Sequence, residues 1–302
     1  ASKMAGKGGS SGKPKRKHKD ASAEAKDASA PIKAYLATYN AACMVGWFMV
    51  LFKAVQYVYV NVDATKGEPL EVATAVLAGV FPAVKNLLTY VQLAAICEVF
   101  HARELLGFVK SDLFSALMQV TSRVVVLIMC LASPSSANAW HGGTMVFAWC
   151  SIEVPRYAFY LISLVKDPAE GVRAVPYALY WYRYSAFFIL YPVGITSELL
   201  CEWMAYQNHG AELAAYTGLA PVGAMLAPYL RNALLGVFAV YIPGAPFLFL
   251  HMMKQRAKSL KNYANASKST SSAEETRLTN EVERLTKLSA RLKKENKKLK
   301  KN

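Results

Sequence analysis

The chain has 302 residues, of which 54% are hydrophobic, and it carries 35 basic against 20 acidic side chains. This apolar content is high for a soluble basic protein, and five cysteines without a CxxC pair argue against a disulfide or metal framework. The basic residues gather at the two ends of the chain, in residues 1–33 and 254–302, and the long middle has nearly equal numbers of each sign. Basic ends on an apolar middle indicate a membrane protein, with nucleic-acid binding as the weaker alternative.

The ends of the chain have the composition of solvated tails. Residues 1–34 are rich in Gly, Ser, Ala and Lys, so we expect a disordered basic cytosolic tail. Residues 261–302 are expected to form a second basic cytosolic tail. Within 274–302, leucine recurs every seventh residue, at Leu278, Leu285, Leu292 and Leu299. This spacing predicts either a short coiled coil, which would allow self-association, or a single charged amphipathic helix.

The middle of the chain, residues 35–260, is expected to be an all-α integral membrane domain. Six apolar segments there approach or exceed the roughly 20 residues that a membrane-spanning helix needs. Their approximate bounds are 39–60, 72–97, 113–132, 144–165, 177–200 and 222–250. Buried helices of a soluble protein are the alternative, but six such lengths in series favour a bundle of six transmembrane helices.

The basic residues of the connecting loops orient the spans. Lys66 is the only basic residue between spans one and two, and the loops after spans three and five have none. The loops on the other side carry Arg103 and Lys110, then Lys166 and Arg173. Because positive loops stay in the cytosol, both ends of the chain are predicted to be cytosolic. The chain ends in Lys-Leu-Lys-Lys-Asn, which is similar to the dilysine retrieval string of endoplasmic-reticulum membrane proteins.

A phenol and a carboxylate mark the fifth span. Tyr191 and Glu198 are seven residues apart, a spacing that returns a helix to nearly the same face after two turns. An ionisable group inside a membrane is costly and marks a functional site by default. The pair could act as an acid and a base, or both groups could be tied to neighbouring helices. No basic residue lies within a turn of Glu198, so we expect its partner on another span, with Arg123 or Arg231 as candidates.

The spacing of the pair also sets a geometric problem. Seven residues of straight helix separate the two Cα atoms by about 10.5 Å, and helical side chains lean the same way instead of converging. Pro192 and Gly194 lie between Tyr191 and Glu198, where a helix can bend. We weigh two arrangements. Either the helix deforms and brings the groups together, which we favour, or the substrate lies along the helix with a bridging water.

Other charged residues in the spans have simpler explanations. Glu153 and Arg156 are three residues apart and can pair on one helix face, and Arg183 can extend toward the cytosolic surface. The string from Cys150 to Arg156 has the C-x5-R spacing of tyrosine phosphatases, but it lacks the glycines of a phosphate-binding loop. The five histidines are scattered singly, so no metal site is predicted.

Several strings within residues 35–260 are similar to one family. They run from Gln92 to His101, Gly107 to Ser111, Gln119 to Arg123, Trp149 to Tyr157, Arg183 to Glu198 and Tyr241 to Arg256. On these residues the chain resembles the very-long-chain (3R)-3-hydroxyacyl-CoA dehydratase family, once called protein tyrosine phosphatase-like proteins. Pro155 departs from the family pattern, which has an aliphatic residue there, and it could kink the fourth span beside Arg156.

The resemblance implies a lyase of the endoplasmic-reticulum membrane that dehydrates 3-hydroxyacyl-CoA to trans-2-enoyl-CoA in fatty-acid elongation. It implies no metal or redox cofactor, and the expected partners are the condensing enzyme and the two reductases of the cycle. The family's essential residues fall on Tyr191 and Glu198. We favour Glu198 as base and Tyr191 as acid, and the reverse assignment stays open. Further candidates for contacting the substrate are Arg123, Arg156, Arg183 and Lys110. The alternative is an inactive family member that serves as a membrane scaffold or transporter.

Overall fold

The computed structural model describes residues 30–102, 105–109, 113–166, 168–217 and 220–299. Every regular element in these ranges is helical, as the apolar segments predict. Some sequence predictions fall outside the described residues: most of the N-terminal tail, the end of the dilysine-like string, and the loop residues Arg103 and Lys110.

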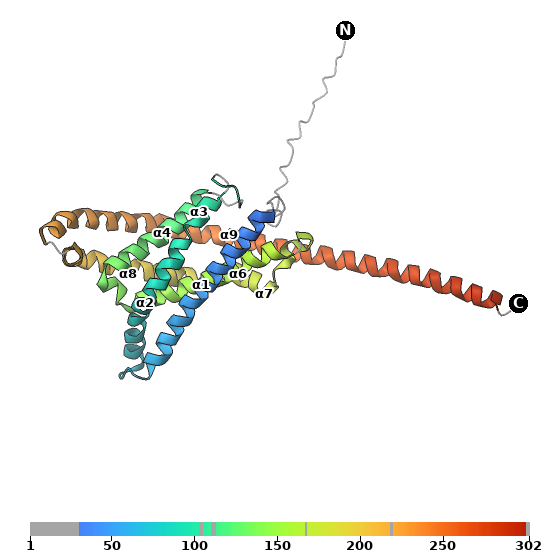
Figure 1. Cartoon of the computed structure of the whole chain (residues 1–302), viewed down its shortest axis with the longest axis horizontal. Coiled ribbons are helices and arrows are strands. Elements are labelled where there is room, and N and C mark those ends of the chain that lie inside the picture. Colours follow the sequence, from blue (N-terminus) through green and yellow to red (C-terminus); the bar gives the residue numbers. More distant parts are fainter. Residues whose placement is uncertain (1–29, 103–104, 110–112, 167, 218–219, 300–302) are drawn as a thin grey trace, which may run out of the picture.

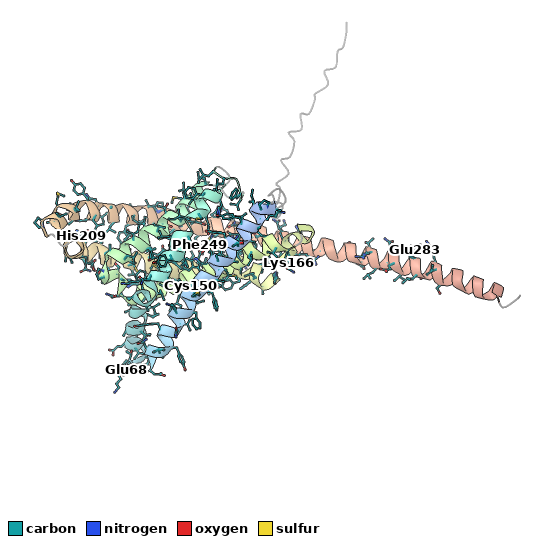
Figure 2. All side chains as sticks on the ribbon, in the orientation of Figure 1. Glu68, Cys150, Lys166, His209, Phe249 and Glu283 are labelled. Atoms are coloured by element: carbon teal, nitrogen blue, oxygen red, sulfur yellow. The ribbon has the colours of Figure 1, made fainter. Side chains whose placement is uncertain are left out.

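The helices follow one another through short connections (Figure 1). Their bounds are α1 Ala30–Val62, α2 Pro69–Ala94, α3 Cys97–His101, α4 Leu113–Ala132, α5 Pro134–Ala137, α6 Trp140–Val165, the 3-10 turn η2 Pro168–Ala174, α7 Tyr177–Ser185, α8 Phe187–Thr217 and α9 Ala220–Leu299. The C-terminal part of α9 extends beyond the bundle, and Glu283 lies on this extension (Figure 2).

The core lies where α1, α2 and α6 meet. Buried residues of α1 recur every three or four positions along one face of the helix, namely Leu36, Asn40, Cys43, Trp47, Val50 and Ala54. Trp47, Phe81 and Trp149, one from each of the three helices, are among the largest fully buried side chains. Lipid tails are as apolar as these side chains, so close packing rather than exclusion of water holds such helices together in a membrane.

α6 approaches α2 closely at Gly143. A Cβ placed there would clash with the backbone carbonyl of Leu77 and lie 3.1 Å from the Cβ of Val80. Small residues at such crossings let helix backbones come near each other, as is common in membrane bundles. Gly143 therefore fixes how deeply α6 enters the bundle, and with it the position of the polar residues further along α6.

Four helical segments are long and apolar enough to cross a membrane. They are Ala30–Val62, Pro69–His101, Phe187–Glu212 and Pro221–Lys268, which correspond to predicted spans one, two, five and six. α4 coincides with the third predicted span, but its apolar part, Ala116–Ala132, is shorter. α6 covers the fourth and carries the charged residues Glu153 and Arg156. A total of six crossings stays a prediction.

The fifth predicted span differs from the structure. The expected helix 177–200 is interrupted at Ala186 between α7 and α8, and α8 then continues through most of the segment that we expected to be a loop. Tertiary contacts account for the extra turns. The hydroxyl groups of Ser136 and Ser135 donate to the backbone carbonyls of Cys201 and Met204, so α5 packs directly on this part of α8.

The sixth predicted span is part of a much longer helix. α9 has 80 residues and continues through Pro228, Pro243 and Pro246. Prolines are tolerated inside helices of membrane bundles because neighbouring groups can satisfy the backbone atoms that proline leaves unpaired. The expected division between membrane domain and tail at 260/261 falls inside α9.

The leucine repeat lies on the extension of α9. Leu278, Val282 and Leu285 are 58%, 63% and 59% exposed, so this apolar stripe faces outward. The prediction of a helix over this segment is confirmed. Its pairing as a coiled coil stays a prediction.

Gly143→Ala should destabilise the bundle, because the new methyl group would push α6 away from α2. Overpacking of this kind costs about 1–3 kcal/mol, which thermal unfolding of the detergent-solubilised protein would report as a lower midpoint. Gly210→Ala in α8 is the matched control, since a Cβ there meets nothing within 4 Å. We expect that control to unfold at or slightly above the unmodified midpoint. Equal midpoints for the two variants would contradict the close crossing.

Candidate functional site

Glu198 accepts two hydrogen bonds from neutral side chains. The indole Nε1 of Trp149 on α6 donates to its Oε1 at 2.7 Å, and the phenol of Tyr241 on α9 donates to its Oε2 at 2.8 Å. Hydrogen bonds to a carboxylate are roughly twice as strong as those between neutral groups. The carboxylate is therefore fixed between two helices without being neutralised by a cation.

The charged partners that we expected for Glu198 are wrong. Arg123 forms its ion pair with Glu153, and Arg231 is exposed on α9. Arg123 still reaches the site indirectly, because its guanidinium carbon lies 5.8 Å from the centre of the Trp149 ring. A cation over an indole face is attracted to it, so Arg123 helps to hold the ring that donates to Glu198.

The phenol of Tyr191 donates to the backbone carbonyl of Ala245 on α9 at 3.0 Å. Its ring also lies 6.0 Å from the ring of Phe249, centre to centre. Tyr191 is thus held by the same helix that supplies Tyr241 to Glu198. Ala245 and Tyr241 are four residues apart on α9, about 6 Å along its axis, so the phenol and the carboxylate meet neighbouring turns of one helix.

The expected break in the helix between Tyr191 and Glu198 is not present. α8 stays helical through Pro192 and Gly194, and the interruption of the fifth span falls earlier, at Ala186. The contacts with α6 and α9 hold both side chains on one continuous helix, so no break in α8 brings the groups together. Of the two arrangements that we weighed, the one in which a substrate lies along the helix fits this continuous helix.

Arg156 joins two carboxylates where α3 meets α6. Its terminal nitrogens donate to the two oxygens of Glu98 at 2.7 and 2.8 Å, and its Nε donates to Glu153 at 2.8 Å. The two-pronged contact is the geometry that guanidinium and carboxylate favour. Glu153 also pairs with Arg123, and Tyr157 donates to Glu98. The predicted pair of Glu153 with Arg156 is confirmed.

This charge network is balanced, and its central carboxylate is buried, while Glu98, Arg123 and Arg156 are half-buried. It holds two cations and two anions, and the Glu153 side chain is only 2% exposed. Buried charges are tolerated when they are paired and hydrogen-bonded in this way. Pro155 lies inside α6 without ending it, so the departure from the family pattern does not remove Arg156 from its partners.

Arg183 lies apart from the network, against aromatic rings. Its Nη2 donates to the hydroxyl of Tyr160 at 3.0 Å, and its guanidinium carbon is 4.7 Å from the ring centres of Tyr160 and Phe159. Its buried Nε has no hydrogen-bond partner among the described residues. Of the expected substrate contacts, Arg123 and Arg156 are thus engaged by carboxylates, whereas Arg183 keeps a spare donor.

Sequence reasoning missed three residues of this region. Trp149 and Tyr241 belong to strings that carry the family resemblance, but nothing in the sequence says that they reach Glu198. Glu202 lies one turn beyond Glu198, is 3% exposed, and has an Oε1 atom that meets no donor in the described part of the chain. Our expected helix end at Leu200 placed Glu202 in a loop. Glu202 follows Glu198 by four residues, a spacing that places both on one helix face, and this spacing is the sequence signal that could have identified it.

The polar residues of this region all lie in a segment that matches a known family. The model of the family described as protein tyrosine phosphatase-like protein, PTPLA, matches residues 92–262. That range includes Glu98, Arg156, Glu198 and Tyr241 and all of α4 to α8. The chain belongs to the PTPLA family.

Curated relatives of this PTPLA-family chain are named as dehydratases. A very-long-chain (3R)-3-hydroxyacyl-CoA dehydratase of Caenorhabditis elegans is 33% identical over 231 residues, covering 76% of this chain and 95% of that protein. The enzyme PASTICCINO 2B of Oryza sativa subsp. japonica is 31% identical, with 77% and 95% covered. Dehydratase 1 of Canis lupus familiaris is 29% identical, with 75% and 82% covered. No solved structure matches the chain.

The C-x5-R string has no phosphatase geometry in this PTPLA-family member. Cys150 is fully buried in the middle of α6 (Figure 2). Backbone N–H groups in the middle of a helix are already bonded, whereas a phosphate-binding loop needs free ones at a helix start. The arginine of the string is occupied by two carboxylates, so it is not free to bind a phosphate.

Arg156→Ala should destabilise the fold, because Glu98 and Glu153 would lose their shared cation. Breaking a buried ion pair costs about 3–5 kcal/mol, which would appear as a lower unfolding midpoint in detergent. Arg231→Ala, the same change at an exposed position, should stay within about 0.5 kcal/mol of the unmodified protein. Arg156→Lys should recover only part of the loss, since an ammonium cannot make the two-pronged contact. Unchanged unfolding of Arg156→Ala would refute a stabilising network.

Proposed function

We propose that this protein dehydrates a very-long-chain 3-hydroxyacyl-CoA to the trans-2-enoyl-CoA. The observation that carries the proposal is the setting of Glu198, a carboxylate fixed on both oxygens by neutral donors, two helical turns from the phenol of Tyr191. A base held in this way stays available to accept a proton. The relatives named as dehydratases support the same reaction.

The reaction requires one base and one acid. Glu198 accepts the proton from C2, the C2–H electron pair forms the C2=C3 bond, and the C3–O bond breaks. Tyr191 gives its proton to the leaving hydroxyl, which departs as water. Positioned acid and base groups each contribute about 10²–10⁴-fold to rate. Since the oxidation state of the acyl chain as a whole does not change, the step calls for no redox partner, and we propose that it uses no cofactor.

Trp149 and Tyr241 are proposed to position the base. Their donors fix both carboxylate oxygens in one orientation, as supporting hydrogen bonds do in preorganised sites. Tyr191 is held in reach of the same region through Ala245. The substrate would lie along α8 and α9, with its two reacting carbons between Tyr191 and Glu198.

Glu198→Gln and Tyr191→Phe should each lower turnover of a 3-hydroxyacyl-CoA by about 10²–10⁴-fold. Each change removes one proton-transfer group and keeps the volume of the side chain. The measurement is formation of enoyl-CoA by the purified full-length chain, with thermal unfolding as the check on folding.

Glu202→Gln is the matched control for Glu198→Gln, because it makes the same change at a buried carboxyl one turn away. We expect it to keep turnover within a few-fold. Full turnover by folded Glu198→Gln would refute the mechanism, and equal losses in both glutamine variants would assign the base to the pair of carboxyls. An unmodified protein that turns over no 3-hydroxyacyl-CoA would favour the scaffold or transporter alternative.

The proposal includes a place and an orientation in the cell. We propose that the chain crosses the endoplasmic-reticulum membrane six times with both ends in the cytosol. Charged CoA would then approach from the cytosolic side, near Lys166, Arg173 and Arg183. The condensing enzyme and the two reductases of the elongation cycle are the proposed partners, because they supply this substrate and consume its product. The exposed stripe on the extension of α9 is proposed for self-association.

Acceptor sites for N-glycosylation test this orientation. A site inserted between α8 and α9, at 217–220, should be modified when the protein is made in microsomes, because that connection is expected in the lumen. A site inserted at 171–173 should stay unmodified, because η2 is expected in the cytosol. The opposite pattern would reverse the orientation, and modification of neither site or both would contradict six crossings.

A further inference from the structure

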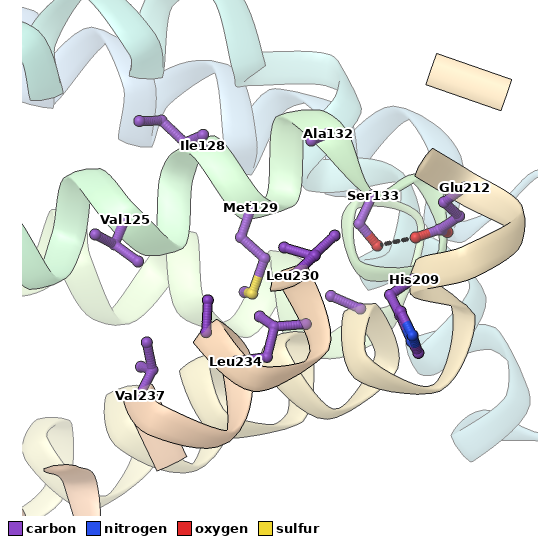
Figure 3. Close-up of a pocket in the computed structure, with 12 residues that line it drawn as sticks. Val125, Ile128, Met129, Ala132, Ser133, His209, Glu212, Leu230, Leu234 and Val237 are labelled. Atoms are coloured by element: carbon purple, nitrogen blue, oxygen red, sulfur yellow. Dashed lines mark hydrogen bonds between the residues drawn. The ribbon is translucent and has the colours of Figure 1, made fainter. Parts of the chain in front are cut away.

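An apolar slot lies among α4, α8 and α9, away from the ionic network (Figure 3). Its volume is about 230 Å³. Val125 and Met129 line it from α4, Ala205 from α8, and Leu234 and Val237 from α9. No residue of the site described above lines the slot, and its walls are almost entirely hydrocarbon. Such a surface suits an alkyl chain.

The slot lies along the same faces of α8 and α9 as the proposed site, further along each helix. On α8, Ala205 follows Glu198 by seven residues, so both lie on nearly the same face two turns apart. On α9, Val237 precedes Tyr241 by four residues, again on one face. The slot therefore begins about one to two helical turns beyond the carboxylate, on the side away from Tyr191.

A polar contact closes the far end of the slot. Glu212 on α8 accepts a hydrogen bond from the hydroxyl of Ser133 at 2.5 Å (Figure 3). It accepts a second from the backbone N–H of Ser135 at 2.7 Å. These bonds tie the α4–α5 corner to α8. An alkyl chain gains nothing from contact with a hydrogen-bonded carboxylate, so this end would limit how far such a chain extends.

We propose that this slot holds the distal part of the substrate's acyl chain and limits its length. The inference rests on the proposed dehydratase function. CoA approaches from the side of Arg183, the two reacting carbons lie between Tyr191 and Glu198, and the rest of the chain continues past Tyr241 into the slot. The rim is open on one side, where Ile128 is 58% exposed, so a long chain can enter from the membrane without threading.

The helix geometry gives the length of acyl chain that fits between the proposed site and the far end of the slot. Leu230, at the far end, is eleven residues from Tyr241, and Glu212 is fourteen from Glu198, which correspond to about 16 and 21 Å. An extended alkyl chain advances about 1.25 Å per carbon, given staggered bonds of about 1.5 Å. About 13 to 17 carbons beyond C3 would fill the distance. A substrate of about eight carbons would end where the slot begins.

Ala205→Leu tests this assignment, because the larger side chain fills the slot two turns away from Glu198. Turnover would be measured for the purified full-length protein with 3-hydroxyacyl-CoAs of about eight and about 20 carbons. We expect kcat/KM to fall about tenfold or more for the long substrate, a magnitude typical of a blocked apolar subsite. The short substrate should be turned over as by the unmodified protein. Ala211→Leu, the same change at an exposed position of α8, should leave both values unchanged.

Leu234→Ala gives an independent test, because it enlarges the slot and should shift the preference toward longer chains. It also keeps the inference testable if Ala205→Leu does not fold. An unchanged ratio of long to short turnover in a folded variant would overturn the assignment and indicate that the slot holds membrane lipid. Absence of turnover at every chain length in the unmodified protein would instead refute the proposed function, so the two failures are distinguishable.

Discussion

The site depends on one buried guanidinium. Arg156 joins Glu98 and Glu153, and Glu153 in turn holds Arg123, so three helices share one balanced network. An apolar bundle offers these charges little water for solvation, so each charge depends on its partner in the network. The network fixes the rotation of α6. Trp149 lies seven residues before Arg156, on nearly the same face, and it is this fixed rotation that directs its indole N–H to Glu198.

α8 and α9 then give the site its direction. Tyr191 and Glu198 on α8 meet Ala245 and Tyr241 on α9, in antiparallel order. Beyond them, Ala205 of α8 and Leu234 and Val237 of α9 line the apolar slot. Arg183, packed against aromatic rings, lies on one side, the proposed acid–base pair lies in the middle, and the apolar slot lies on the other side. That order matches a molecule with a charged head, a reacting centre and a long alkyl tail.

Proline and glycine have less effect on this backbone than their local preferences indicate. α8 continues through Pro192 and Gly194, α6 through Pro155 and α9 through three prolines. In isolation each proline costs a helix about 3 kcal/mol. In the bundle, neighbouring helices can satisfy the backbone and packing holds the axis. Gly143 has a steric role, because a side chain there would clash with the backbone of α2.

The sequence alone determined the helical class, most helix positions and the Glu153–Arg156 pair, because hydropathy and helical spacing are local properties. It also selected Tyr191 and Glu198 as the candidate pair. It also identified the family, because the resemblance rests on the order of residues within short stretches of the sequence. The tertiary structure decided the partners of Glu198, the extension of α8 past Leu200 and the unbroken helix at Pro192. These depend on which side chains of separate helices meet, as Trp149 and Tyr241 meet Glu198. No spacing within a single helix encodes such contacts.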